Sequence, residues 1–451
     1  MGLRTLLFAS LFAFALLGAL YNPLVGLIGY MGHYCIGPER QWWHAPLSGY
    51  NMRYSFLLAI VSAFSILINR SKLAYGQLLV KQEWLVLAFL AVVWLAAITS
   101  SVSVGRYSTV DHPTMKMLKI SFFLLMLSHV ATDRKKLKIV TWSFVIFALI
   151  LGMQAYEVPL RAFSHGRLES VGGADFGDAN RFGGFMAGML FIIGCQFLNC
   201  RRFWERALVF LAGGFAANAI ILTRCRGAML GLAVGMLVAL TFSAPRYRKI
   251  IVIGLITAGL GFAHLSDEAF VERSSTIVVD AGEERDASAS SRLEIWEGGL
   301  KMLMAHPLLG VGPGNFYQNI GNYQPLHPGR DAHNTLVRCA GELGLVGLSI
   351  FIWLVFNAFL VLRKCIRDAS IFPPEVEKDF QLMSMGYMAA LFAILAYGMT
   401  GTLVYTEYLW WLLIIPVCLQ RAFDNEIEAQ RLLSATSDTL GEDNVRGRLD
   451  V

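Results

Sequence analysis

Residues 290–347 read SSRLEIWEGGLKMLMAHPLLGVGPGNFYQNIGNYQPLHPGRDAHNTLVRCAGELGLVG. This segment is the longest polar interruption in a chain that otherwise consists mostly of apolar runs long enough to cross a membrane. Its first residues, Ser291–Glu294, have the form of a helix-capping box and predict a short helix that carries Arg292 and Trp296 about one turn apart. We therefore expect the chemistry of this protein to lie in or beside this segment.

The second half of the segment leads into the next apolar run. The glycines and the proline of Gly310–Gly314 predict a turn. His333 and Asn334 stand at the start of the apolar run, and Arg338 follows Asn334 by one helical turn. Cations and a titratable ring at the edge of a membrane indicate an anionic substrate and a proton transfer.

The composition excludes an ordinary soluble protein. The chain has 451 residues, of which 56% are hydrophobic and only 16% are charged, and its mean hydropathy is +0.54. Apolar runs of membrane-crossing length recur along it and predict an all-α polytopic membrane protein. The seven cysteines form no CxxC pair, so neither a zinc site nor a disulfide framework is indicated. The first apolar run, Leu6–Leu20, is interpreted as an uncleaved helix and not as a signal peptide.

About twelve transmembrane helices are expected. They should lie near residues 5–31, 53–69, 84–101, 115–131, 137–156, 182–199, 206–223, 227–243, 249–265, 336–362, 383–401 and 403–421. The first range is interrupted by Asn22 and Pro23, so a separate re-entrant segment over residues 22–37 is the alternative to one bent helix.

The distribution of charge predicts the orientation. Four short loops rich in Lys and Arg fall on one side of this arrangement, at residues 134–138, 201–206, 246–249 and 363–367. The positive-inside rule makes this side cytoplasmic. Both termini are then cytoplasmic, and the large loop 266–335 lies outside, which is the periplasm if the protein resides in a bacterial inner membrane.

We expect the chain to divide into three consecutive parts. They are an N-terminal transmembrane bundle (1–217), a core that includes the outer loop and its short helices (218–421), and an acidic, disordered cytoplasmic tail (422–451). The sequence has no P-loop and no GxGxxG motif that enters a helix. Synthetic chemistry on the outer side, where nucleotides are absent, therefore needs a donor that is already activated on a lipid.

Arg224 and Arg226 lie where one apolar run ends on the outer side and the next begins. The positive-inside rule disfavours arginine on this side, so the presence of these two arginines needs an explanation. Binding of a phosphate or diphosphate by the planar guanidinium is one explanation. The other is that both side chains reach lipid headgroups at the interface.

His333 is the sharpest candidate for a catalytic residue. A neutral imidazole with a pKa near 6.5 can take a proton from a hydroxyl group. The alternative is a histidine that only makes structural hydrogen bonds at the start of its helix. Arg292 lies in the same outer segment, where it is either a solvated loop residue or a partner of the anionic substrate.

Asp178, Asn180 and Arg181 precede another apolar run on the outer side, within the glycine-rich stretch GGADFGDANRFGG. One interpretation is that the Asp or Asn side chain caps the following helix. The other is that these residues bind sugar hydroxyls. His264, His306 and His327 match no metal-ligand spacing, so no metal site is predicted.

Four motifs in order resemble the O-antigen ligase and polymerase superfamily over roughly residues 218–350. They are Arg226-Gly227 at the start of an apolar run, SRLEIWEGGLKM (291–302), HPLLGVGPGNF (306–316), and HN (333–334) followed by GELGLVGL (341–348). The stretch YNPLVGLIGYM (21–31) and the Trp-rich loop 38–46 are more similar to the exosortase-associated O-glycosylation ligases. Cys225 departs from the superfamily, which usually has serine before the arginine.

The resemblance implies a membrane glycosyltransferase of the GT-C kind that uses no metal and no cofactor. It would transfer a glycan from undecaprenyl diphosphate to lipid A–core or to a protein, among membrane lipids and without nucleic acid. His333 would be the base, and Arg226 and Arg292 would hold the diphosphate, with Arg224 and Arg338 as further ligands. Asp178, Asn180, Asn334 and Trp296 are weaker candidates for binding the glycan or the acceptor.

Two other functions fit the same sequence. A polymerase would use the same chemistry with another lipid-linked repeat as acceptor. A transporter of lipid-linked glycans would make no bond, and it should place ionisable residues near the middle of its helices. Here these residues gather at one side, which favours the enzyme.

Overall fold

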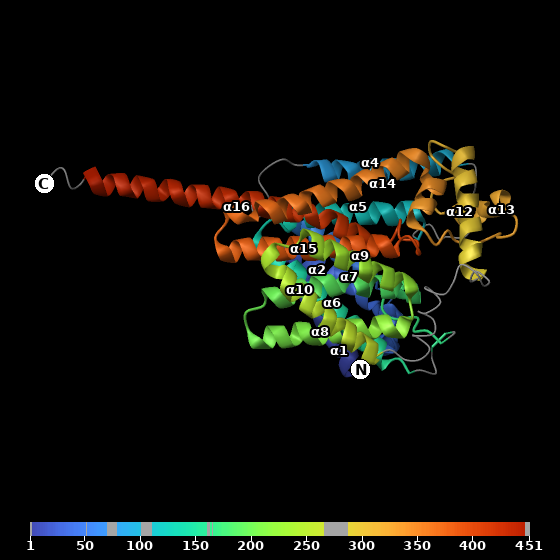
Figure 1. The fold of residues 1–451 in the computed structure, drawn as a ribbon, viewed down its shortest axis with the longest axis horizontal. Coiled ribbons are helices and arrows are strands. Elements are labelled where there is room, and N and C mark those ends of the chain that lie inside the picture. The colour runs from blue at the N-terminus through green and yellow to red at the C-terminus, as the bar shows by residue number, and fades with distance from the viewer. Residues whose placement is uncertain are drawn as a thin grey trace.

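The structure is a computed structural model that describes residues 2–50, 52–69, 79–100, 111–159, 163–164, 166–265 and 287–446. In these residues the chain is α-helical and contains no strand (Figure 1). The helices are α1 (Leu3–Tyr21), α2 (Pro23–Ile36), α3 (Tyr54–Ile68), α4 (Lys81–Thr99), α5 (Pro113–Val130), α6 (Arg134–Glu157), α7 (Ala179–Asn199), α8 (Phe203–Thr223), α9 (Arg226–Phe242), α10 (Pro245–Leu265), α12 (Ala287–Ala305), α13 (Phe316–Tyr323), α14 (Thr335–Asp368), α15 (Pro374–Tyr397) and α16 (Glu407–Arg446). Short 3₁₀ turns are η1 (Pro38–Arg40), η2 (Trp42–Tyr50), η5 (Ala174–Phe176) and η6 (Ala369–Ile371).

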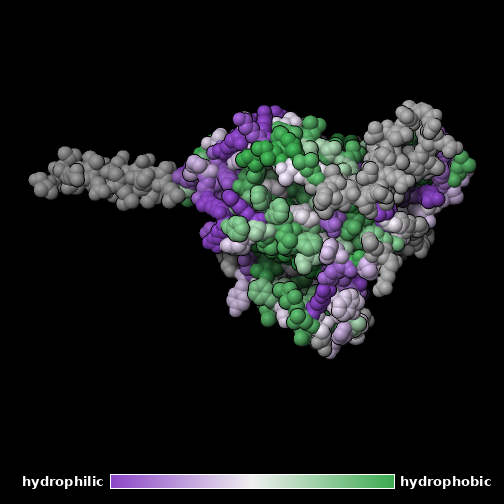
Figure 2. All heavy atoms as spheres, turned by 60° about the horizontal axis from the view of Figure 1, so that its bottom comes forward, coloured by the Kyte–Doolittle hydropathy of each residue, from purple (hydrophilic) through white to green (hydrophobic). Residues whose placement is uncertain are grey.

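The protein is an all-α polytopic membrane protein. A helix lies over each predicted range, and over the first range there are two. Among the described residues, seven helices are long and apolar enough to cross a membrane, or eight if the bent pair η2–α3 is one span. Figure 2 shows apolar residues over the middle of one face of the bundle. The predicted fold class, an all-α polytopic membrane protein, is therefore confirmed. The number of about twelve membrane spans stays a prediction.

The first predicted helix is an antiparallel hairpin of α1 and α2. The Asn22 side chain accepts a hydrogen bond from the Leu24 amide at 3.1 Å, which caps α2, and Pro23 occupies its first position. The glycines Gly18 and Gly26 let the two helices approach closely, facing Val25 and Ala19 respectively. Farther from the turn, Gly29 faces Ala15. From the pair Ala19–Gly26 to the pair Ala15–Gly29 the position in α1 falls while the position in α2 rises, so the two helices run in opposite directions.

This hairpin reverses the prediction for the N-terminus. Arg4 forms an ion pair of 2.8 Å with Glu157 at the end of α6, whereas Arg421 in α16 pairs at 2.9 Å with Glu83 at the start of α4. These contacts lie at opposite ends of the bundle, because α4 and α6 both run toward the end that carries α12 (Figure 1). The prediction that both termini lie on one side is therefore wrong.

The tail after residue 421 is also different from the prediction. α16 continues as a helix through Arg446 and extends away from the bundle (Figure 1). The stretch EIEAQRLL (426–433) consists mainly of strong helix formers, which the acidic and Ser/Thr-rich composition of the tail concealed. The structure thus has a helix at residues 422–446, where the sequence analysis expects a disordered tail, and the cytoplasmic position of this tail stays a prediction.

The predicted basic loops gather at the end of the bundle opposite α12. Arg134 and Lys138 contact the buried carboxylate of Asp379 at 2.7 and 2.6 Å, and Arg246 contacts Glu377 at 3.2 Å. Asp379 and Glu377 lie in the first turns of α15. The positive charges thus lie on one end, as the alternation of loops predicted, and the cytoplasmic assignment of this end stays a prediction.

α14 is broken at Gly344, and this break holds the outer helices in place. Gly344 has φ 66° and ψ −167°, a conformation that is essentially restricted to glycine. The carbonyls of Gly341 and Glu342 accept hydrogen bonds from the amides of Val311 and Gly312 at 2.9 and 3.0 Å. The glycine turn predicted from residues 310–314 therefore docks on the backbone groups that the break leaves open, which fixes α12 and α13 against α14 (Figure 1).

Candidate active site

The polar residues predicted from the sequence lie at the end of the bundle that carries α12. The chain enters or leaves the membrane bundle there at the starts of α7, α9, α14 and α16 and at the ends of α8 and α15. The turn between α15 and α16, residues 398–406, connects these elements. Gly227 at the start of α9 packs directly against Thr400, and Thr335 at the start of α14 donates to the Gly401 carbonyl at 2.9 Å.

His333 is presented by a segment that is fixed on both sides. The Trp296 indole donates to the Ala332 carbonyl at 2.8 Å, which joins α12 to this segment. The Asn334 side chain accepts from the amides of Leu336 and Val337 at 2.9 and 3.2 Å and so caps α14. His333 itself is exposed and has a φ of 46°, an uncommon conformation for a residue other than glycine.

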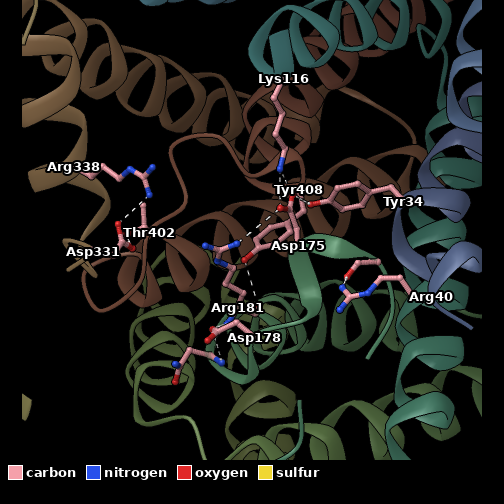
Figure 3. A network of polar contacts seen from close by, with 12 residues as sticks. Tyr34, Arg40, Lys116, Asp175, Asp178, Arg181, Asp331, Arg338, Thr402 and Tyr408 are labelled. Atoms are coloured by element: carbon pink, nitrogen blue, oxygen red, sulfur yellow. Dashed lines mark hydrogen bonds and ion pairs between the residues drawn. The ribbon is translucent and has the colours of Figure 1, made fainter. Parts of the chain in front are cut away.

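A chain of buried charges holds the residue two positions before His333. Asp331 accepts from Arg338 at 3.0 Å and from the Thr402 hydroxyl at 2.7 Å (Figure 3). Arg338 donates also to Glu342 at 2.9 Å, and the second oxygen of this fully buried carboxylate accepts from Tyr405 at 2.8 Å. With two carboxylates on its guanidinium, Arg338 is suited to positioning this segment more than to binding the diphosphate that the sequence suggested.

The surroundings of His333 favour a neutral imidazole. Although the ring is exposed, nearby protein atoms displace part of its hydration, and this is the first cause that lowers the pKa of His333; the charges of Arg292 and Arg181 lower it further. The carboxylates of Asp331 and Asp178 act in the opposite direction without cancelling the effect. A histidine with this pKa is unprotonated at neutral pH and can accept a proton from a substrate hydroxyl.

The turn between α8 and α9 carries the other two predicted arginines. Arg224 ends α8 in the left-handed conformation with φ 48°, and Arg226 is the first residue of α9. Both side chains are half-buried at the same end of the bundle as His333. Arg292 is half-buried on α12, whose position over this end is fixed by Trp296.

Asp178 and Asn180 have structural contacts. Asp178 caps α7, since its side chain accepts from the amides of Asn180 and Arg181 at 3.0 Å each. The Asn180 side chain accepts from Arg167 at 2.5 Å, and Arg167 also donates to the Thr223 carbonyl at 3.0 Å. Capping of α7, one of the two interpretations offered by the sequence, accounts for Asp178, and the binding of sugar hydroxyls by either residue stays a prediction.

A second group at the same end was not predicted. Lys116 contacts both oxygens of the buried Asp175 at 2.7 and 2.8 Å, and the Tyr34 hydroxyl donates to Asp175 at 2.6 Å (Figure 3). Burial alone would raise the pKa of Asp175, but Lys116 and Tyr34 outweigh it and the pKa is lowered. The only signal in the sequence was Lys116 itself, a charged residue in the first turn of an apolar helix.

The histidines considered for a metal have other partners. His306 lies 3.1 Å from the Tyr323 hydroxyl, and His327 lies 2.7 Å from a Glu294 oxygen. The side chain of His264 is outside the described residues, as are residues 266–286 of the large loop. In the described part of the chain no three His, Cys, Asp or Glu side chains are arranged to hold a metal ion.

An apolar cavity of about 580 Å³ opens beside the site. It lies between α9, α14 and α15, and its lining includes Phe242, Thr335, Leu336, Phe356, Phe392 and Met399. Thr335 follows His333 by two positions, whereas Phe242 ends α9 at the opposite side of the bundle. The cavity therefore starts at the first turn of α14, which follows His333 in the chain, and extends along the membrane-crossing part of the helices.

Together these features define a class of protein: a helical membrane protein with a polar site of arginines and one histidine at one end and an apolar cavity beside it. Residues 209–352 match the family model described as O-Antigen ligase. The resemblance predicted over residues 218–350 is thereby confirmed for this part of the chain. The narrower resemblance to exosortase-associated ligases stays a prediction.

Two curated relatives were found. Both carry the name "Putative polysaccharide ligase", one from Rickettsia conorii and one from Rickettsia felis. Each is 25% identical to this chain over 189 residues, a match that covers 36% of this chain and 44% of the relative. The match thus spans less than half of the length of these relatives.

Proposed function

We propose that the protein transfers a glycan from undecaprenyl diphosphate to an acceptor hydroxyl at the periplasmic face of the inner membrane. The observation that carries this proposal is that the segment of His333 is held by Trp296 and Asn334 and leads into Thr335, which lines an apolar cavity, on the end of the bundle that also carries Arg226 and Arg292. The match to the O-Antigen ligase model and the names of the relatives support it.

The donor fits the two parts of the site. The cavity beside His333 is lined almost entirely by apolar side chains and suits a polyprenyl chain lying in the membrane. Arg226 and Arg292, with Arg224 beside them, would bind the diphosphate through charge-assisted hydrogen bonds. A lipid-linked donor explains why the polar and the apolar part adjoin.

The reaction then needs one proton transfer. His333 takes the proton of the acceptor hydroxyl, and the oxygen attacks the anomeric carbon of the donor sugar. The bond between this carbon and the diphosphate oxygen breaks, and the arginines stabilise the negative charge on the leaving diphosphate. Attack from the side opposite the leaving group inverts the anomeric centre, and no metal takes part.

The acceptor is lipid A–core or a protein, and a polymerase that adds a lipid-linked repeat is the second candidate. Glycan analysis of lipopolysaccharide and of secreted proteins in a deletion strain distinguishes these acceptors. A transporter of lipid-linked glycans is disfavoured because the site charges gather at one end of the bundle.

Replacement of His333 by alanine tests the mechanism. In purified, reconstituted protein, transfer should fall by about 10²–10⁴-fold, the usual contribution of a general base, while donor binding is retained. The wild-type rate should rise through an apparent pKa below the ordinary value for histidine, since the pKa of His333 is lowered. Near-normal transfer by the alanine variant would remove His333 from the mechanism.

A further inference from the structure

Arg181 is an arginine of this site that lies outside the segment matched by the O-Antigen ligase model. It belongs to the first turn of α7, where its amide donates to Asp178 and its carbonyl accepts from the Tyr408 hydroxyl at 3.4 Å. The backbone of Arg181 is thus held on both sides, and its side chain leaves α7 from a fixed point.

The carboxylate next to Arg181 is already satisfied by other groups. Lys116 and Tyr34 contact the oxygens of Asp175 at 2.6 to 2.8 Å, whereas the Arg181 guanidinium approaches this carboxylate only to 4.0 Å. Among the described residues, Asp175 is the one carboxylate within this distance, and no hydrogen bond from the Arg181 guanidinium is found. A guanidinium has five N–H donors, and the Arg181 side chain is only 35% exposed, so most of this capacity is unused in a partly covered position.

The guanidinium lies toward Asp331, which is two positions before His333 (Figure 3). Figure 3 shows it between the group of Lys116, Asp175 and Tyr34 on one side and the group of Asp331, Arg338 and Thr402 on the other. Its positive charge contributes to lowering the pKa of Asp331 as well as that of His333. Arg181 and Arg292 are two cations whose charge lowers the pKa of the imidazole.

We infer that Arg181 is a further arginine of the donor site, beside Arg224, Arg226 and Arg292, and that its unused N–H groups bind the diphosphate of the lipid-linked donor. The inference rests on the proposed function, and it adds a residue from the N-terminal half of the chain to a site otherwise built from α8–α9 and α12–α14. Asp175 is fixed by Lys116 and Tyr34. Its negative charge orients the Arg181 guanidinium at 4.0 Å without a hydrogen bond between them. The bidentate geometry of guanidinium suits the two phosphates better than a point charge does.

The test uses the full chain in lipid nanodiscs and farnesyl diphosphate as the probe. Binding is measured as the rise in the unfolding temperature, and transfer is measured with the lipid-linked glycan donor. The Arg181→Ala variant should bind the probe roughly 10- to 100-fold more weakly, the effect of losing a charged hydrogen bond. The KM for the donor should rise by a similar factor, and Arg181→Lys should restore only part of the binding.

Arg40→Gln is the matched control. Arg40 lies at the same end and donates to the Gly173 carbonyl at 3.1 Å, but Figure 3 shows it below Tyr34, on the side of the view away from Asp331. Its loss removes one positive charge from this end and should leave probe binding unchanged. An equal loss in Arg40→Gln and Arg181→Ala would show a general effect of charge and overturn the inference.

Two further results separate this inference from the proposed function. If Arg226→Ala and Arg292→Ala lose probe binding while Arg181→Ala binds as the wild type does, only the inference on Arg181 fails. If none of the three variants loses binding, the donor site itself is wrong. If Arg181→Ala does not fold, Arg181→Lys decides, because a folded lysine variant with wild-type affinity shows that the guanidinium is not needed.

Discussion

Replacement of Gly344 by alanine tests how the outer helices are held over the imidazole. At φ 66° and ψ −167°, a residue with a side chain is strained by about 1–3 kcal/mol. The added Cβ atom would lie 2.3 Å from the backbone carbon and oxygen of Leu308, so the turn after α12 must move.

The size of the effect follows from the bonds that this movement breaks. Leu345 donates to the Pro307 carbonyl at 2.8 Å and Val346 to that of Leu308 at 3.4 Å, and each bond contributes about 0.5–1.5 kcal/mol. Strain and lost hydrogen bonds together give a loss of about 2–6 kcal/mol in the free energy of unfolding. Transfer activity should fall as well, because α12 carries Arg292.

The assay is unfolding of the detergent-solubilised protein together with glycan transfer after reconstitution. Gly214→Ala in α8 is the matched control, since a Cβ atom there meets nothing within 4 Å and alanine is favoured in a helix. This control should be neutral or slightly stabilising. Wild-type stability and activity of Gly344→Ala would refute the role assigned to the break in α14.

Three other predictions follow from the site and the fold. Cysteine-labelling should place Leu3 and the loop 266–335 on the outer side and the loop between α5 and α6 inside; labelling of Leu3 from the cytoplasm would contradict the α1–α2 hairpin. Arg226→Ala and Arg292→Ala should each lose most of the transfer activity, with lysine restoring only part of it; full activity of both lysine variants would show that the guanidinium geometry is unimportant. Asp331→Asn removes a negative charge that raises the pKa of the imidazole, so the rising limb of the pH–rate profile should move to lower pH, and an unchanged limb would contradict this coupling.

The apolar runs predicted the helices well because the lipid environment requires long helices there. The hairpin at Asn22 and Pro23 was harder to predict from the sequence, because the same two residues can bend one helix or begin a second one. The glycines that pack α1 against α2 distinguish these cases only once the partner helix is known.

The site residues were predictable where the interaction is local. Arg338 and Glu342 are four positions apart in a helix, so their ion pair could have been expected from spacing alone. Lys116 and Asp175 are 59 positions apart, and no local pattern connects them. The sequence therefore pointed to His333 and to the outer arginines, and it placed Arg181 beside Asp178 and Asn180, but it did not reveal the contacts that orient these residues or a role for Arg181 in binding the diphosphate.

The break at Gly344 has a mechanical consequence. It separates the first turns of α14, which carry the residues that fix His333, from the lipid-facing remainder of the helix. A helix changes its tilt when the bilayer becomes thicker or thinner. The upper piece accepts hydrogen bonds from the amides of Val311 and Gly312, and the lower piece donates to the carbonyls of Pro307 and Leu308. The two pieces are therefore joined through this turn instead of by continuous helical hydrogen bonds, so tilting of the lower piece reaches the imidazole only through the turn. The transfer rate should accordingly depend little on the acyl-chain length of the bilayer lipids. A steep dependence in reconstituted bilayers would show that the two pieces of α14 move together as one rigid helix.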